Sequence, residues 1–198
     1  MSTDPIDDDA RAVLDFWFGA PGSATDGKPR VEWFRKSDAF DREIERRFAP
    51  LIDRALSGGL QNWDAQPPSA LARILLLDQF TRNVFRDTPR AFAGDALALA
   101  AARALVASGF DLALSPQQRA FAYLPFEHAE DLAMQNESLR HFTRLNADAE
   151  GFAGSLDYAQ RHHAIIERFG RFPHRNAILG RTSTPEELAF LEEPGSSF

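Results

Sequence analysis

Apolar residues recur at helical spacing along nearly the whole chain. Phe40, Ile44, Phe48 and Ile52 repeat every four residues, which places them on one face of a helix. Runs of β-branched residues with apolar side chains at every second position do not occur, so the sequence does not predict strands. The pattern therefore predicts an all-α protein.

Capping and turn residues divide this pattern into helices. Ser37 is a good N-cap, and Gly58-Gly59 ends the helix that follows it. Ser115-Pro116 and Thr184-Pro185 each begin a capping box with proline at the first helical position. We expect about eight helices with short joints, in one domain over residues 1–198, with flexible tails at 1–8 and 194–198.

The stretch ALARILLLDQFTRNVFRD is apolar enough to form a central buried helix. Asp78, Arg82 and Arg86 lie at i, i+4 and i+8 within it, with Gln79 and Asn83 beside them. One interpretation is a solvent face with a routine Asp78–Arg82 ion pair. We favour a polar groove that faces a cleft, because so apolar a helix leaves little room for a wide wet face.

The stretch YLPFEHAEDLAMQ holds a second polar group, and Pro125 should kink or divide its helix. His128, Asp131 and Gln135 lie at i, i+3 and i+7, which places them on one line of a helix. Glu127 and Asp131 then form a carboxylate pair that could share a proton or hold a divalent cation. The alternative is a core histidine bonded to Asp131. Neither HExxH nor ExxH occurs, so we predict no metal site.

His162 completes an apolar line of Tyr158, Ile165 and Phe169, so it should face inward. A buried imidazole needs a hydrogen-bond partner. His128, Asp131 or an incoming ligand are the candidates.

After Gly170 and Pro173, a tight turn holds Arg171, His174, Arg175 and Asn176. Residues 161–181 contain five arginines and one glutamate. Such a cluster suits a carboxylate or a phosphate, to which each guanidinium offers two donors. The alternative is a structural network in which these arginines pair with carboxylates such as Asp78, Glu130 or Asp131.

Composition narrows the classes of function. The chain has 198 residues, no cysteine and a net charge of −7, which excludes disulfides, thiolate catalysis and Cys-ligated metals. It shows no signal-peptide pattern and no apolar run near 18 residues, so we expect a cytoplasmic protein with no membrane partner. The acidic charge argues against nucleic acid as a partner. No Gly-rich phosphate loop is present, so we predict no cofactor.

Four stretches, VLDFWFG, ILLLDQFTRNVFRDTPRAFAGD, YLPFEHAEDLAMQ and HHAIIERFGRFPHRNAILGRTSTPEELAFL, resemble a bacterial family known as domain of unknown function 924. The resemblance runs from about Val13 to Leu191. It implies antiparallel helix pairs grouped with tetratricopeptide-like repeat superhelices, and it implies no reaction. The polar positions named above fall in the characteristic segments of the family. Trp17-Phe18 and Trp33-Phe34 also look family-like, and such apolar pairs are expected in the core.

Three hypotheses follow. The first is a polar pocket for a small anion, formed by the segments Asp78–Arg86, Glu127–Gln135 and His162–Asn176. Whether the protein is an enzyme is open; if it is, His128 with Asp131 as its orienting group is the acid–base pair we expect for hydrolysis or proton transfer. The second is an adaptor whose groove binds a peptide or protein segment. The third is a purely structural network. A homodimer is also left open.

Overall fold

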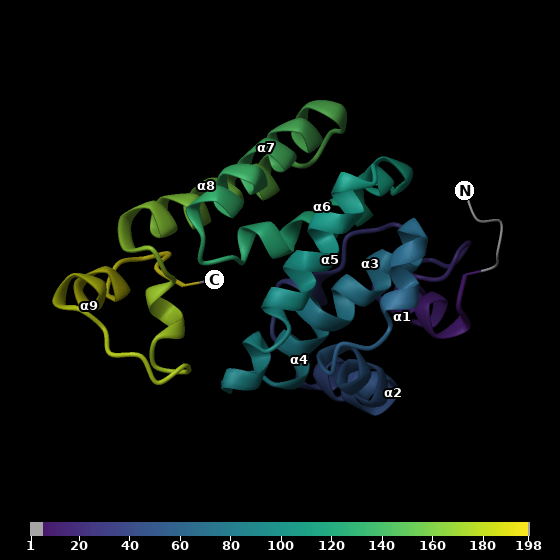
Figure 1. Cartoon of the computed structure of the whole chain (residues 1–198), viewed down its shortest axis with the longest axis horizontal. Coiled ribbons are helices and arrows are strands. Elements are labelled where there is room, and N and C mark those ends of the chain that lie inside the picture. The colour runs from purple at the N-terminus through teal and green to yellow at the C-terminus, as the bar shows by residue number, and fades with distance from the viewer. Residues whose placement is uncertain (1–5, 198) are drawn as a thin grey trace. The chain divides into compact units, whose positions relative to one another are not determined.

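The computed structural model describes residues 6–197, and this part of the chain is helical with no strand, so the predicted fold class is confirmed. The helices are α1 (Asp8–Phe18), α2 (Asp38–Leu56), α3 (Pro67–Leu75), α4 (Thr81–Val84), α5 (Asp95–Ala107), α6 (Pro116–Glu127), α7 (Leu132–Asp148), α8 (Ala153–Phe169) and α9 (Pro185–Leu191) (Figure 1). A π-helical turn, η3 (Leu76–Phe80), joins α3 to α4. When α3, η3 and α4 are counted as one continuous helix, residues 6–197 form eight helices besides short 3₁₀ turns.

The 3₁₀ turns are η1 (Val31–Trp33), η2 (Gln61–Ala65), η4 (Pro89–Phe92), η5 (Phe110–Ala113) and η6 (Pro173–Arg175). No helix among the described residues has both the length and the hydropathy that a bilayer crossing requires. Of the predicted tails, residues 1–5 and 198 lie outside the described part. Asp8 already belongs to α1, and the Ser196 hydroxyl donates to the carbonyl of Leu191 at 3.1 Å.

The chain divides into two compact units. The first comprises the chain up to Arg86 together with Arg90–Pro125, and the second comprises Asp87–Pro89 and the chain from Phe126 onward. The single domain, the pairing of all helices and the tetratricopeptide-like superhelix stay predictions.

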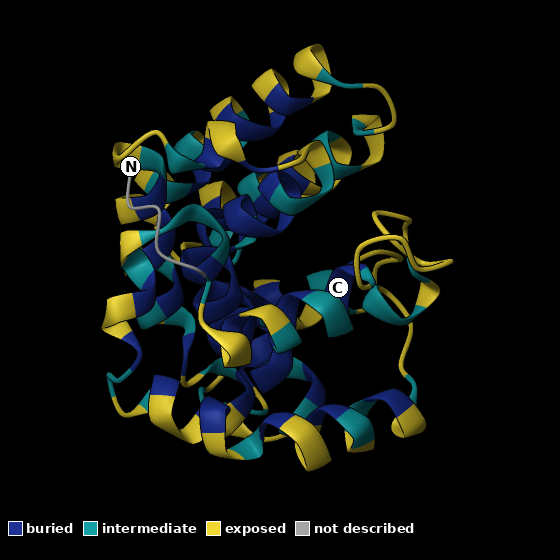
Figure 2. Cartoon of the chain, turned by 90° about the vertical axis from the view of Figure 1, so that its right-hand side faces the viewer, coloured by how far each residue is buried: buried dark blue, intermediate teal, exposed yellow. Residues whose placement is uncertain are grey.

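In the first unit, α3 is the central helix. Every residue from Ser69 to Leu75 is buried, and α3 packs against α1 and α5. Most helices alternate buried and exposed turns, as Figure 2 shows, whereas α3 is buried on nearly all sides, as its apolar sequence predicts. Trp17 of α1 lies against the rings of Phe80 and Phe121, with centroids 5.4 and 5.5 Å away.

Gly94 lies close against the π-helical turn. A Cβ atom on Gly94 would lie 2.1 Å from the carbonyl oxygen of Leu77, so only glycine fits beside this turn. The Thr81 hydroxyl donates to the same oxygen at 2.8 Å. The wider turn rotates the residues after it relative to a regular α-helix, which changes the faces predicted for Asp78, Arg82 and Arg86.

In the second unit, α7 and α8 form an antiparallel hairpin joined by residues 149–152. The two helices lie side by side in Figure 1. His163, late in α8, bonds through Nε2 to Oδ1 of Asn136, early in α7, at 2.9 Å. Ile165, Ile166 and Phe172 form the buried core against which Phe169 and Phe190 pack.

The predicted caps form as hydrogen bonds. The Ser37 hydroxyl accepts from Phe40 N at 3.3 Å, and both bonds of the Thr184–Glu187 capping box are present. Gly170 ends α8 in the left-handed conformation. Two expectations of burial are wrong, because Tyr158 is 51% exposed and Phe34 is 78% exposed.

Candidate functional site

The polar residues of the second unit gather where helices end, and this corrects one prediction. The helix containing Pro125 ends at Glu127, and α7 begins at Leu132, so His128 and Asp131 lie in a joint and do not share a helical line with Gln135. Asp131 has an extended backbone and is the N-cap of α7, where its Oδ1 accepts from Met134 N at 3.0 Å. Asp131 is exposed and Glu127 is buried, so the predicted carboxylate pair on one helix is also wrong.

Gln135 ties this joint together. Its side-chain amide donates to the carbonyl oxygens of Glu127 at 2.7 Å and Ala129 at 2.8 Å. The side chain is fully buried, so these two bonds fix the path of the backbone between α6 and α7. Gln135 thus positions the residues on either side of His128.

His162 faces inward, as the sequence predicts, and is 4% exposed. Its Nδ1 lies 2.9 Å from the carbonyl of Tyr158 and 3.3 Å from Oε1 of Glu127. Burial, together with the positive charges of His128, Arg175 and His174, lowers the pKa of His162 to about 3. The ring is therefore neutral near pH 7, with its proton on Nδ1 toward the Tyr158 carbonyl, and the Glu127 contact is not an ion pair.

The ring of Phe172 is the centre of this group. It lies edge-on to His162 with centroids 5.4 Å apart and beside His174 at 5.6 Å. The guanidinium of Arg175 stacks over it, with Cζ 4.4 Å from the ring centroid. His128 is 6.2 Å from His162 between centroids. We call His128, His162, His174 and Arg175 the basic cluster.

Two bidentate ion pairs hold the turn that carries this cluster. Arg171 donates through Nε and Nη2 to the two carboxylate oxygens of Glu187, at 2.6 and 2.8 Å. Arg181 donates to both oxygens of Glu130 at 2.6 and 2.9 Å. Such forks are the strong form of the Arg–carboxylate pair, so the turn is rigid.

The pKa values of the two carboxylates follow from these contacts. The hydrogen bonds from Arg171 are the main cause that lowers the pKa of Glu187 to about 2. For Glu130, burial raises the pKa, but the hydrogen bonds from Arg181 and from Phe172 N outweigh it, and the net pKa lies below the ordinary value. Both carboxylates are therefore charged at neutral pH.

Asn176 joins the two ion pairs. Its Oδ1 accepts from Nε of Arg181 at 2.9 Å, and its Nδ2 donates to Oε2 of Glu187 at 3.3 Å. It is 1% exposed, so it belongs to the interior of this network.

The predicted residues of the central helix belong to the first unit. Asp78 is fully buried and accepts from Nε2 of its neighbour Gln79 at 2.7 Å. Arg82 does not make the routine pair expected with Asp78; it pairs with Asp95 at 2.8 Å and donates to the carbonyl of Ala91. The π-helical turn between Asp78 and Arg82 breaks the regular i,i+4 spacing on which that pair depends.

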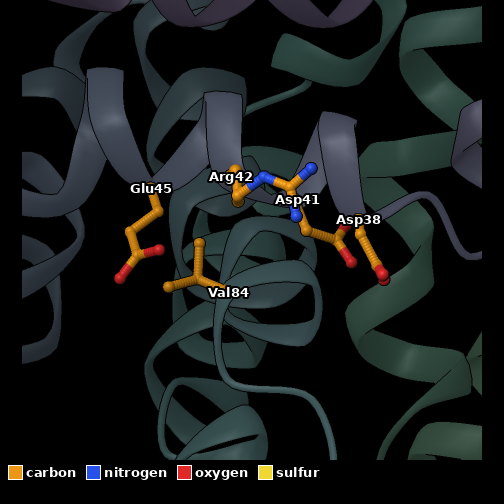
Figure 3. Close-up of a pocket in the computed structure, with 5 residues that line it drawn as sticks. All are labelled: Asp38, Asp41, Arg42, Glu45 and Val84. Carbon is orange, nitrogen blue, oxygen red and sulfur yellow. The ribbon is translucent and has the colours of Figure 1, made fainter.

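Asn83 and Arg86 both bind Asp41 of α2. The Asn83 amide donates to Oδ1 at 2.7 Å, and Nε of Arg86 donates to Oδ2 at 2.6 Å. Asp41 borders a hollow of about 230 Å³, whose other lining residues are Asp38, Arg42, Glu45 and Val84. Figure 3 shows the four α2 side chains beside Val84 of α4. Three carboxylates against one arginine make this hollow unsuited to an anion.

Sequence reasoning missed Glu187 as a member of the polar network, whereas Arg181 was among the five arginines of residues 161–181, and its pair with Glu130 is one that the structural hypothesis named. The signal for Glu187 was present, because the Thr184 capping box already fixes its position. Its bond to Arg171 needs a fold-back of the chain that no local pattern encodes. Among the described residues, no group of three His, Asp or Glu side chains has an arrangement that could hold a metal ion.

Comparison with known proteins agrees with this fold. The family model described as "Bacterial protein of unknown function (DUF924)" matches residues 13–195. A solved structure, a protein of unknown function, ATU0120, from Agrobacterium tumefaciens, is 42% identical, with a TM-score of 0.80 over 92% of this chain and 96% of that one. Comparison with curated proteins gave no match. The chain therefore belongs to the bacterial DUF924 family.

Proposed function

We propose that the second unit binds a small carboxylate or phosphate ligand at the basic cluster. The observation that carries the proposal is the geometry of the basic cluster: His128 lies 6.2 Å from His162 between centroids, and Phe172, which packs on His162, also contacts His174 and Arg175. In a chain of net charge −7, so local a gathering of basic side chains favours an anion.

The arginines of this turn make different kinds of contact, and these contacts support the proposal. Arg171 and Arg181 each use two donors on a carboxylate of the protein, as the structural hypothesis expects. Arg175 is carried by η6 between these two arginines, and its Cζ lies 4.4 Å from the centroid of Phe172. The two ion pairs would thus preorganise the turn, and Arg175 would contact the ligand.

The roles within the cluster follow from hydrogen-bonding capacity. His128, His174 and Arg175 would donate to the anion. His162, with its proton on Nδ1 toward Tyr158, would present Nε2 as an acceptor. The cluster therefore suits an anion that also carries a hydroxyl, such as a hydroxy acid or a protonated phosphate. An acid–base role for His128 with Asp131 stays a prediction.

The test is the thermal midpoint of the purified protein against inorganic phosphate, simple carboxylates, hydroxy acids and acidic peptides. A ligand at a hundred times its Kd adds about 2.7 kcal/mol of stability, so the midpoint should rise with concentration. The rise should vanish in Arg175→Gln and in His128→Gln. It should persist in Arg161→Gln, which removes an exposed charge one residue from His162.

A flat response to every compound would contradict the proposal, as would an equal rise in wild type and in a folded His128→Gln. His128 is only half-buried, so this variant remains informative if Arg175→Gln does not fold. A rise with acidic peptides alone would favour the peptide-binding adaptor instead.

A further inference from the structure

A small apolar knob projects from the first unit at η1. Val31 is 63% exposed and Phe34 is 78% exposed. Phe34 N donates to the carbonyl of Val31 at 3.1 Å, and residues three apart in a 3₁₀ turn lie one above the other. The two side chains therefore share one face of the turn, and most of their surface is in contact with solvent.

The base beneath this knob is anchored in the aromatic core. Nε1 of Trp33 donates to the carbonyl of Trp17 at 3.2 Å, and its ring lies 4.9 Å from that of Phe121. The guanidinium of Arg30 donates to the carbonyl of Phe16 at 2.5 Å and stacks over Phe40. Phe34 is thus presented by a fixed turn, where its ring meets Trp33 edge-on with centroids 6.3 Å apart and most of its side chain is exposed.

Three exposed cations flank the knob in the sequence: Lys28, Arg35 and Lys36. No ion pair joins them to any of residues 6–197. Lys28 and Lys36 are the two lysines of the chain. Residues 28–36 contain four basic side chains and Glu32, a net charge of +3 in a chain of net charge −7.

We propose that this knob docks the protein reversibly on an anionic lipid surface. Phe34 and Val31 would enter the interface between headgroups and acyl chains, and the three cations would contact the lipid phosphates. Asp26 and Asp38 flank the segment and reduce its local charge, whereas charges beyond a Debye length of about 8 Å are screened by salt. The expectation of no membrane partner rested on the lack of a spanning segment, which surface docking does not need.

The shape of the knob distinguishes this partner from two others. A peptide binds in a groove or along a sheet edge, whereas Val31 and Phe34 project outward. Single-stranded nucleic acid needs several stacking rings along a basic groove, and here only Phe34 is freely presented. A bilayer surface supplies a soft, planar and negatively charged medium, which suits a projecting apolar pair flanked by cations.

The experiment is co-sedimentation of the full-length protein with vesicles of phosphatidylcholine, with and without phosphatidylglycerol. Wild type should bind the anionic vesicles at about 0.1 M salt and dissociate at about 1 M, where the Debye length is about 3 Å. Phe34→Ser should lower the partition coefficient several-fold. Combined Lys28→Ala, Arg35→Ala and Lys36→Ala should lower it about tenfold or more.

Two matched variants control for general loss of hydrophobicity and charge. Leu112→Ser changes another exposed apolar residue of the first unit, and combined Arg42→Ala, Arg54→Ala and Arg103→Ala removes the same charge elsewhere. Both should bind like wild type. The proposal is overturned if anionic vesicles bind no protein, if the phosphatidylcholine vesicles bind equally, or if Phe34→Ser binds as wild type. It is also overturned if oligothymidylate or an acidic peptide binds through Phe34 while vesicles do not.

Discussion

At the scale of single residues, the second unit combines carboxylates that are held charged with a histidine that is held neutral. Glu187 and Glu130 hold arginines in fixed positions, while His162 is kept neutral by burial and by nearby positive charge. Fixed ion pairs thus support a turn that brings further positive charge toward a neutral ring. These two features predict different responses to mutation.

The pKa of His162 predicts how stability depends on pH. Because the folded state lowers this pKa from 6.5 to about 3, the unfolded chain binds more protons in that range, and stability is lost as pH falls from about 6.5 toward about 3. His162→Gln should flatten the curve between pH 6 and 5 by up to about 1.4 kcal/mol per pH unit. Urea unfolding of both proteins measures this slope.

The groups that face His162 are Glu127, His128, His174 and Arg175. The lowered pKa values of Glu130 and Glu187 also reduce stability on acidification, but starting from their ordinary value of 4.5. The interval from pH 6 to 5 therefore separates the titration of histidine from that of these two carboxylates, and the difference between wild type and variant assigns it to His162. Equal slopes in wild type and variant would show that His162 is not held neutral by the fold.

Glu187 and its neighbour Glu186 form a matched pair for testing the network. Glu187→Gln leaves the Arg171 fork without its buried carboxylate, and we expect the thermal midpoint to fall by about 5 °C or more. Glu186→Gln removes an exposed pair with Arg168 and should change the midpoint by less than about 2 °C. Calorimetry on both variants decides; similar shifts would mean that the Arg171–Glu187 pair adds nothing beyond a surface contact.

At the scale of elements, the sequence predicted where helices begin better than how they continue. The sequence correctly predicts the N-caps Ser37, Ser115 and Thr184, because a cap involves only neighbouring residues. By contrast, α8 begins at Ala153 without a side-chain cap, so no capping residue marks its start. The π-helical turn was not predicted, and Gly94, which lies against it, is distant in sequence.

Gly94 provides a test of that turn. In Gly94→Ala the new methyl group would meet Leu77 O at 2.1 Å, so we expect a loss of about 2 kcal/mol or more from the resulting displacement. Gly154→Ala, whose Cβ would meet no atom within 4 Å, is the control and should be neutral or slightly stabilising. Urea unfolding gives the free energy of unfolding of each variant. Equal values for the two variants would contradict the close approach of Gly94 to Leu77.

Two variants of Asp131 distinguish a role as helix N-cap from a role in orienting His128. Asp131→Ala removes the bond to Met134 N and should cost about 1 kcal/mol, as N-cap losses usually do, a fall of about 2–4 °C in the thermal midpoint. If capping is its only role, anion binding by the folded variant should be unchanged. Asp131→Asn retains a capping side chain and should restore most of the stability. Loss of anion binding in both variants would instead support the orienting role toward His128.

At the scale of the whole molecule, the sequence reached the fold class and the family, since helical periodicity and long motifs are properties of the chain itself. The two units and the partners of each polar residue were beyond it, because they depend on how distant segments pack. Arg86 shows the limit: its place in a polar stripe was clear, yet its partner is Asp41, 45 residues earlier. Anion binding is therefore proposed for the second unit alone.

The most direct measurement of that claim is an NMR titration of the five histidine rings with inorganic phosphate, assigned through single His→Gln variants. We predict saturable ¹⁵N shifts at His128 and His174, with little change at His163, which bonds to Asn136, and with the His162 proton remaining on Nδ1. Shifts of equal size at all five rings, or none at His128 and His174 up to high phosphate, would contradict a phosphate site in the basic cluster.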